Sequence, residues 1–150
     1  MSRKKEAMRR GVGPRDVIRH IGQPEPLTWW RTMRAEQLDA TAAIVLRKSI
    51  ATIAIIDEPS WRAAAIGDVA AAVGLALRLD PARATPIAFD LVMTALAACA
   101  ADGDSTACLA MSFVLRRRPG ASKSEARIAT SWLVRSFAGV LRKRRNGGAT

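Results

Sequence analysis

The sequence predicts an all-α protein: a compact bundle of about five helices with a basic, partly disordered N-terminal arm. Alanine is abundant, tyrosine is absent and runs of β-branched residues are scarce, which favours helix over sheet. Apolar residues recur at helical spacing between short breaks rich in Pro, Gly and Asp. The 150 residues, 49% of them hydrophobic, are enough to bury one core. We expect a flexible arm over residues 1–26, one helical domain over 27–145 and a disordered tail over 146–150.

The first long helix is predicted over residues 28–56, with Thr28 as its N-cap. Its second half, residues 44–56, is apolar on nearly every face, which is typical of a helix at the centre of a bundle. In the arm before it, a short helix over residues 14–21 is predicted to dock on the body through Val17, Ile18 and Ile21.

Four further helices follow, separated by clear stop signals. They are predicted over residues 60–79, 86–101, 105–117 and 123–144. Ser122 and Glu125 have the spacing of a capping box that opens the last helix. The connections between these helices are short, so we expect sequential helices to pack antiparallel.

The charge is distributed unevenly along the chain, which carries a net +11. Residues 1–19 carry +5, residues 20–115 carry −3 and residues 116–150 carry +9. A mildly acidic body with basic ends predicts a polyanionic partner. Arginine outnumbers lysine by 19 to 5, which suits bidentate phosphate contacts. A genome rich in G and C would give the same excess of arginine.

The last helix is predicted to be amphipathic. A helical wheel places Lys123, Arg127, Arg135, Arg142 and Arg145 on the outward face, and Ala129, Trp132, Leu133, Phe137 and Val140 on the face toward the body. Basic residues near helix ends also complement the helix dipole, but after residue 104 only Glu125 is acidic. Phosphate contacts are therefore predicted for Arg3, Lys4, Lys5, Arg9, Arg10, Arg116, Arg117, Arg118, Lys123, Arg127, Arg135, Arg142, Lys143, Arg144 and Arg145.

Duplex DNA or structured RNA is the predicted partner. The tryptophans and phenylalanines mostly fall at positions that a core requires, so base stacking on a single strand is not favoured. The Pro119-Gly120 break is unlike the turn of a helix-turn-helix, so sequence-specific reading is not predicted. An anionic lipid surface is less favoured, because the wheel assigns the apolar face of the last helix to the core.

The alternative function is a helical interaction protein or accessory subunit. Trp29 and Trp30 are adjacent, so both cannot face one core, and an exposed indole would anchor a protein interface. An enzyme is not predicted. It would need a deep pocket in which Asp68 or Asp90 lies beside a basic residue; a structural ion pair with Arg62, Arg78 or Arg83 is the expected role of these aspartates.

No catalytic residue, metal site or cofactor is predicted. The single histidine, His20, rules out most metal clusters, and a calcium loop beginning at Asp102 would need Glu where Phe113 stands. Cys99 and Cys108 are either a redox pair or, as we favour, small buried residues kept reduced. The sequence contains no apolar run long enough for a transmembrane helix or a signal peptide, and a cytoplasmic protein is expected.

Overall fold

The computed structural model describes residues 25–55 and 57–146, with side chains described as far as Leu141. This part of the chain contains no strand, so the all-α class is confirmed. It has seven α-helices rather than about five: α2 (Trp29–Thr32), α3 (Ala40–Ile50), α4 (Trp61–Ile66), α5 (Val69–Arg78), α6 (Pro86–Ala101), α7 (Ser105–Arg117) and α8 (Lys123–Asn146), with 3-10 turns η1 (Pro26–Thr28) and η2 (Ala35–Gln37). The predicted arm and tail lie outside the described residues except at their inner ends.

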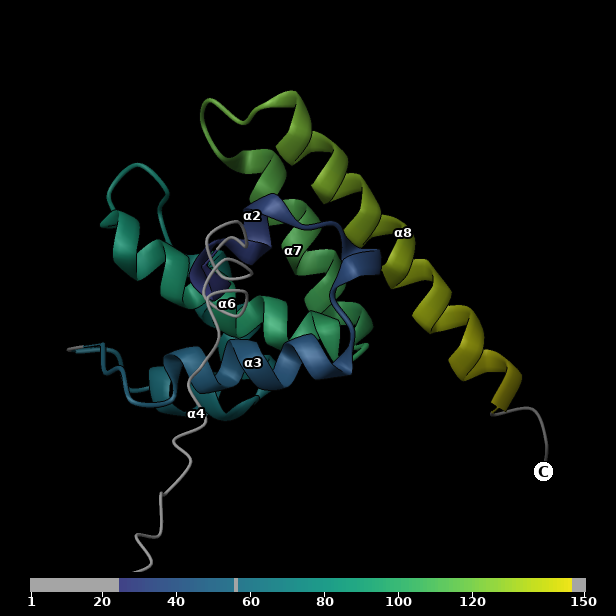
Figure 1. Cartoon of the computed structure of the whole chain (residues 1–150), viewed down its shortest axis with the longest axis horizontal. Helices are drawn as coiled ribbons and strands as arrows, with labels where there is room; N and C mark the ends of the chain where they lie inside the picture. The colour runs from purple at the N-terminus through teal and green to yellow at the C-terminus, as the bar shows by residue number, and fades with distance from the viewer. Residues whose placement is uncertain (1–24, 56, 147–150) are drawn as a thin grey trace, which may run out of the picture.

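The centre of the bundle is α6. Every residue from Leu91 to Ala101 is buried, and α3, α5 and α7 pack around this helix. The longest helix, α8, lies along α7 at the outside of the molecule (Figure 1). The prediction of a central helix over residues 44–56 was wrong, because Ile44 and Val45 of α3 are exposed.

The predicted helix over residues 28–56 is divided. The backbone is extended at Met33–Arg34 and again at Leu38–Asp39. Local polar contacts favour these breaks: the Arg34 N–H donates to the Gln37 side chain at 2.8 Å, and the Ala42 N–H donates to the Asp39 carboxylate at 2.9 Å. Beyond Ile50 the chain leaves the helix through a β-branched stretch, whose Ile53 carbonyl accepts from Trp61 Nε1 at 2.7 Å.

The predicted helix over residues 60–79 is divided at Gly67. Its φ of +107° ends α4 in the left-handed conformation, and the Asp68 N–H donates to the Ala63 carbonyl at 2.9 Å. Asp68 then caps α5 by accepting from the Ala71 N–H at 2.8 Å. Asp68 is therefore an exposed capping residue and is not buried inside a helix.

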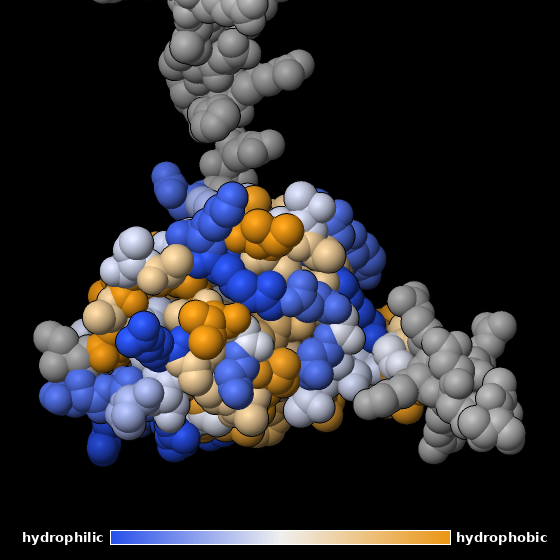
Figure 2. Space-filling view, turned by 90° about the horizontal axis from the view of Figure 1, so that it is seen from below, coloured by the Kyte–Doolittle hydropathy of each residue, from blue (hydrophilic) through white to orange (hydrophobic). Residues whose placement is uncertain are grey.

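The last three helices agree with the prediction. The bounds of α6 and α7 are those expected, and α8 begins at Lys123 and continues two residues beyond 144. The capping box is confirmed: the Ser122 N–H donates to the Glu125 carboxylate at 2.9 Å, and the Glu125 N–H donates to Ser122 Oγ at 3.1 Å. On the face seen in Figure 2, apolar side chains (orange) lie among hydrophilic ones (blue).

Candidate nucleic-acid interface

The first half of α8 divides cleanly into a buried and an exposed face. Ile128, Ala129 and Trp132 are buried against the body. Lys123, Arg127 and Thr130 lie on the opposite face and are exposed. This half of the helix therefore presents basic side chains outward, as the helical wheel predicted.

The segment Arg34–Leu38 is fastened to α8 by side chains of that helix. The Ala35 N–H donates to Ser131 Oγ at 3.0 Å. The Arg135 guanidinium donates to the carbonyls of Ala35 and Leu38 at 2.6 and 2.5 Å, and to that of Ala101, the last residue of α6, at 2.8 Å. These contacts place Arg34 beside α8, where it lines a shallow depression of about 450 Å³ together with Arg127 and Thr130.

Arg116 reaches the same surface from the end of α7. Its Nη2 lies 3.4 Å from Thr130 Oγ1, and Lys123 lies one helical turn before Arg127. The four exposed side chains Arg34, Arg116, Lys123 and Arg127 are called the basic cluster below. None of them forms an ion pair with a carboxylate of the described residues, although Glu36 lines the same depression as Arg34 and Arg127.

Arg34 was not among the residues predicted to contact phosphate. It is far from α8 in the sequence and comes from a segment that was predicted to be helical. Only the tertiary hydrogen bonds of Ser131 and Arg135 bring it to the surface of α8. No pattern in the sequence indicates this contact.

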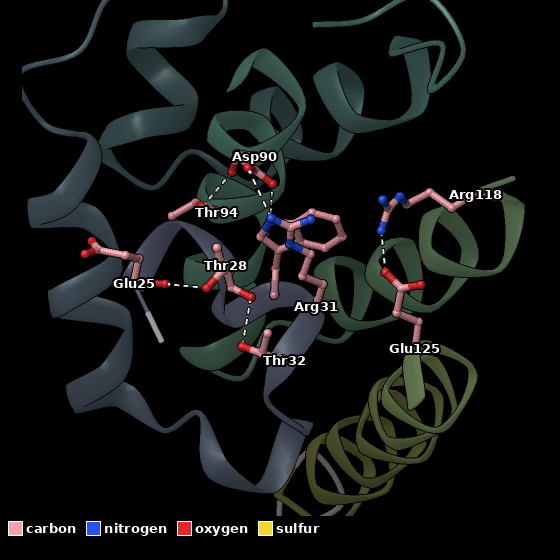
Figure 3. Close-up of polar contacts among 9 residues, drawn as sticks. Glu25, Thr28, Arg31, Thr32, Asp90, Thr94, Arg118 and Glu125 are labelled. Atoms are coloured by element: carbon pink, nitrogen blue, oxygen red, sulfur yellow. Dashed lines mark hydrogen bonds and ion pairs between the residues drawn. The ribbon is translucent and has the colours of Figure 1, made fainter. Parts of the chain in front are cut away.

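Arg118 and Arg135 have internal partners. Arg118 forms an ion pair with Glu125 (Figure 3). It also lies over the Trp30 ring, 5.2 Å from the ring centroid. Arg135 is bound to three backbone carbonyls, and the prediction that it points outward was wrong. We therefore leave both residues out of the basic cluster.

The other predicted phosphate contacts lie away from the cluster or outside the described residues. Arg117 is exposed and lies over the Phe113 ring at 5.1 Å, beside a groove between α5 and α7. The structure does not describe the side chains of Arg3, Lys4, Lys5, Arg9, Arg10, Arg142, Lys143, Arg144 and Arg145. It does place residues 142–145 in the last turns of α8.

The two adjacent tryptophans both contact the body. Trp30 is 1% exposed, and its Nε1 donates to the Asp90 carboxylate at 3.1 Å. Trp29 is half-buried and packs against the core. Trp30 therefore offers no exposed anchor for a protein partner.

Asp90 is half-buried and paired, although not with the arginines expected. Its second carboxylate oxygen lies 3.7 Å from Arg31, whereas Arg78 pairs with Glu58 and Arg83 with Asp80. Asp90 and Arg31 line a pocket of about 170 Å³. Ligand pockets are usually larger, roughly 300–1,000 Å³, so this arrangement favours a structural role for Asp90.

Both cysteines are buried and unpaired. Burial raises the pKa of the Cys99 thiol, and it raises the pKa of Cys108 to about 11. Both thiols are therefore weak nucleophiles at neutral pH. Over the described ranges, no three His, Cys, Asp or Glu side chains gather where they could hold a metal ion. None of the helices described here combines the length and apolarity that crossing a membrane requires.

Comparison with models of known protein families, with curated proteins and with solved structures gives no match for this chain. Its function is therefore inferred from the chemistry of its own surface.

Proposed function

We propose that this chain is a non-catalytic protein that binds the phosphate backbone of duplex DNA or structured RNA without reading the base sequence. The observation that carries the proposal is the basic cluster. The five ion pairs of the described residues all use other arginines, while Arg34, Arg116, Lys123 and Arg127 remain exposed without a carboxylate partner. Four unpaired cations on one surface attract phosphate.

The distribution of charge along the sequence supports an extended contact. Arg142, Lys143, Arg144 and Arg145 continue the helix that carries Lys123 and Arg127, and no acidic residue follows Glu125. The predicted arm adds Arg3, Lys4, Lys5, Arg9 and Arg10. A cytoplasmic location belongs to the same proposal, supported by two cysteines that are both unpaired.

The second candidate function is that of a helical interaction protein or accessory subunit. It is favoured by an apolar groove of about 400 Å³ between α5 and α7, lined by Val73, Leu77, Leu109 and Phe113 among others. Apolar grooves of this kind accept amphipathic helices. We place it second because the charge of the chain, net +11, is not explained by an apolar groove.

Charge reversal of the basic cluster tests the first candidate. The variant R34E/R116E/K123E/R127E is expected to bind duplex DNA at least roughly 100-fold more weakly at low salt, because it replaces four phosphate contacts by repulsion. Fluorescence anisotropy of a labelled duplex measures this affinity, and competition with structured RNA identifies the preferred polymer. Circular dichroism checks that the helices remain.

The matched control is K48E/R62E/R78E/R83E, which changes the net charge equally but alters exposed residues of α3, α4, α5 and the loop after it. Its two broken surface ion pairs cost little stability. The control is expected to lose much less affinity than the cluster variant. Equal losses would show that only net charge matters, and the proposed surface would be incorrect.

A further inference from the structure

The second half of α8 exposes large apolar side chains. Val134, Phe137 and Leu141 are 61%, 61% and 63% exposed, and Val140 is 44% exposed. The prediction that Phe137 and Val140 face the body was wrong. At three- and four-residue spacing, Val134, Phe137 and Leu141 continue the exposed face that begins with Lys123, Arg127 and Thr130. This face is therefore basic in its first half and apolar in its second half.

Val134 and Phe137 are exposed because they lie on the side of α8 that faces away from the body, and Leu141 lies where α8 extends past the body. Gly139 still lies close to the turn between α6 and α7: a Cβ at this position would be 3.4 Å from Ser105 Cβ. Beyond it the helix continues to Asn146 and projects away from the other helices (Figure 1). We call Val134, Phe137, Val140 and Leu141 the α8 apolar face.

The charge around the α8 apolar face restricts what can cover it. Lys123 and Arg127 precede it, Arg142–Arg145 follow it, and the sequence has no acidic residue after Glu125. A second copy packed antiparallel through the same face would bring basic residues against basic residues. The occupant must therefore be both apolar and anionic.

We propose that the α8 apolar face docks on an anionic lipid bilayer. Helices that lie in a bilayer interface combine an apolar face with flanking Lys and Arg, which contact lipid phosphates. Val134, Phe137 and Leu141 enter the boundary of the acyl chains, with Lys123 and Arg127 at the headgroups. Arg127 lies two turns before Val134 on the same side of the helix, so it reaches the lipid phosphates when the apolar side chains enter the bilayer.

This inference shares Lys123 and Arg127 with the proposed nucleic-acid site and adds the α8 apolar face. The nucleic-acid proposal does not use the α8 apolar face. The two are therefore tested by different variants of the same full-length chain.

Sedimentation with vesicles tests the docking surface. The chain is expected to bind vesicles of phosphatidylcholine and phosphatidylserine and not vesicles of phosphatidylcholine alone, because the charge attraction is missing there. The variant F137S/L141S is expected to lower the affinity for the mixed vesicles by roughly 10- to 100-fold, since two large side chains no longer enter the bilayer.

The matched control is L109S/F113S, which removes the same two residue types from α7, where they are 51% and 48% exposed. This control is expected to bind the mixed vesicles like the unmodified chain. F137S/L141S is also expected to keep its affinity for duplex DNA, which shows that the variant is folded and that DNA binding does not need the α8 apolar face.

Three results would overturn the docking proposal. One is the absence of binding to mixed vesicles at low salt. Another is unchanged vesicle binding by F137S/L141S, which would reduce the interaction to charge alone. The third is binding to a synthetic amphipathic helix of Glu and Leu without binding to vesicles, which would assign this face to an acidic protein partner.

Discussion

Arg135→Met is expected to destabilise the fold by about 3–5 kcal/mol, although the side chain was predicted to point into solvent. The guanidinium of Arg135 donates to the carbonyls of Ala35, Leu38 and Ala101. Met retains much of the apolar stem but leaves these acceptors without their charged donor. Urea unfolding followed by circular dichroism measures the change in the free energy of unfolding.

The control for Arg135 is Arg127→Met, two turns earlier on the same helix. Arg127 is exposed and forms no ion pair with the described residues, so its replacement is expected to change the free energy of unfolding by less than about 0.5 kcal/mol. Arg127→Met is instead expected to weaken duplex DNA binding. If the two variants had equal stability, Arg135 would not hold the Arg34–Leu38 segment on α8.

Trp30→Ala is expected to cost about 3–5 kcal/mol of stability, because it empties a fully packed position. The Trp30 ring lies 5.4 Å from that of Phe89, and the guanidinium groups of Arg31 and Arg118 lie 5.5 and 5.2 Å from its centroid. The substitution also removes the donor to Asp90, which is only partly exposed. The same unfolding experiment measures this loss.

Two further variants make the Trp30 result interpretable. Trp30→Phe keeps an aromatic ring but loses the hydrogen bond to Asp90, so a smaller loss of about 1–3 kcal/mol is expected. Phe137→Ala removes an aromatic ring that is 61% exposed and is expected to change stability by less than about 1 kcal/mol. If Phe137→Ala lowered the free energy of unfolding as much as Trp30→Ala, the Phe137 side chain would be covered by another part of the chain and would not be exposed.

The sequence predicted those helices whose ends carry strong local signals. Thr85-Pro86, Asp104 and the pair Ser122 and Glu125 act through hydrogen bonds within one turn, so α6, α7 and the start of α8 were found correctly. The break at Gly67-Asp68 also had a local signal, a glycine followed by a capping residue. The four-residue spacing of the small residues Ala63, Gly67 and Ala71 is also that of one helix face, and it led to the prediction of a continuous helix.

The division of the predicted helix over residues 28–56 depends partly on distant residues. Apolar periodicity continues through this region, but Ser131 and Arg135 bind the backbone near Ala35 from about 100 positions away. The basic cluster depends on the same contacts, since they bring Arg34 to α8. Local propensity does not contain this information.

The helical wheel of α8 was accurate in the first half of the helix. Trp132 and Ala129 are buried as predicted, and Lys123 and Arg127 are exposed. The error lies at the borders between the two faces. Arg135 is about 60° from Trp132 around the helix and donates to backbone carbonyls of the body, whereas Phe137 is about 40° from Lys123 and is exposed. Residue type, and not position on the wheel, assigned these two side chains to the wrong face.

The most direct test of phosphate binding is the affinity of the unmodified chain for labelled duplex DNA, measured over a series of salt concentrations. We expect the logarithm of the binding constant to fall linearly with the logarithm of the salt concentration, with a slope of about −0.9 for each phosphate contacted. R34E/R116E/K123E/R127E loses about four phosphate contacts, so its slope should be shallower by roughly 0.9 for each of them. Absence of binding at low salt, or the same slope in both proteins, would contradict the assignment of the basic cluster to phosphate binding.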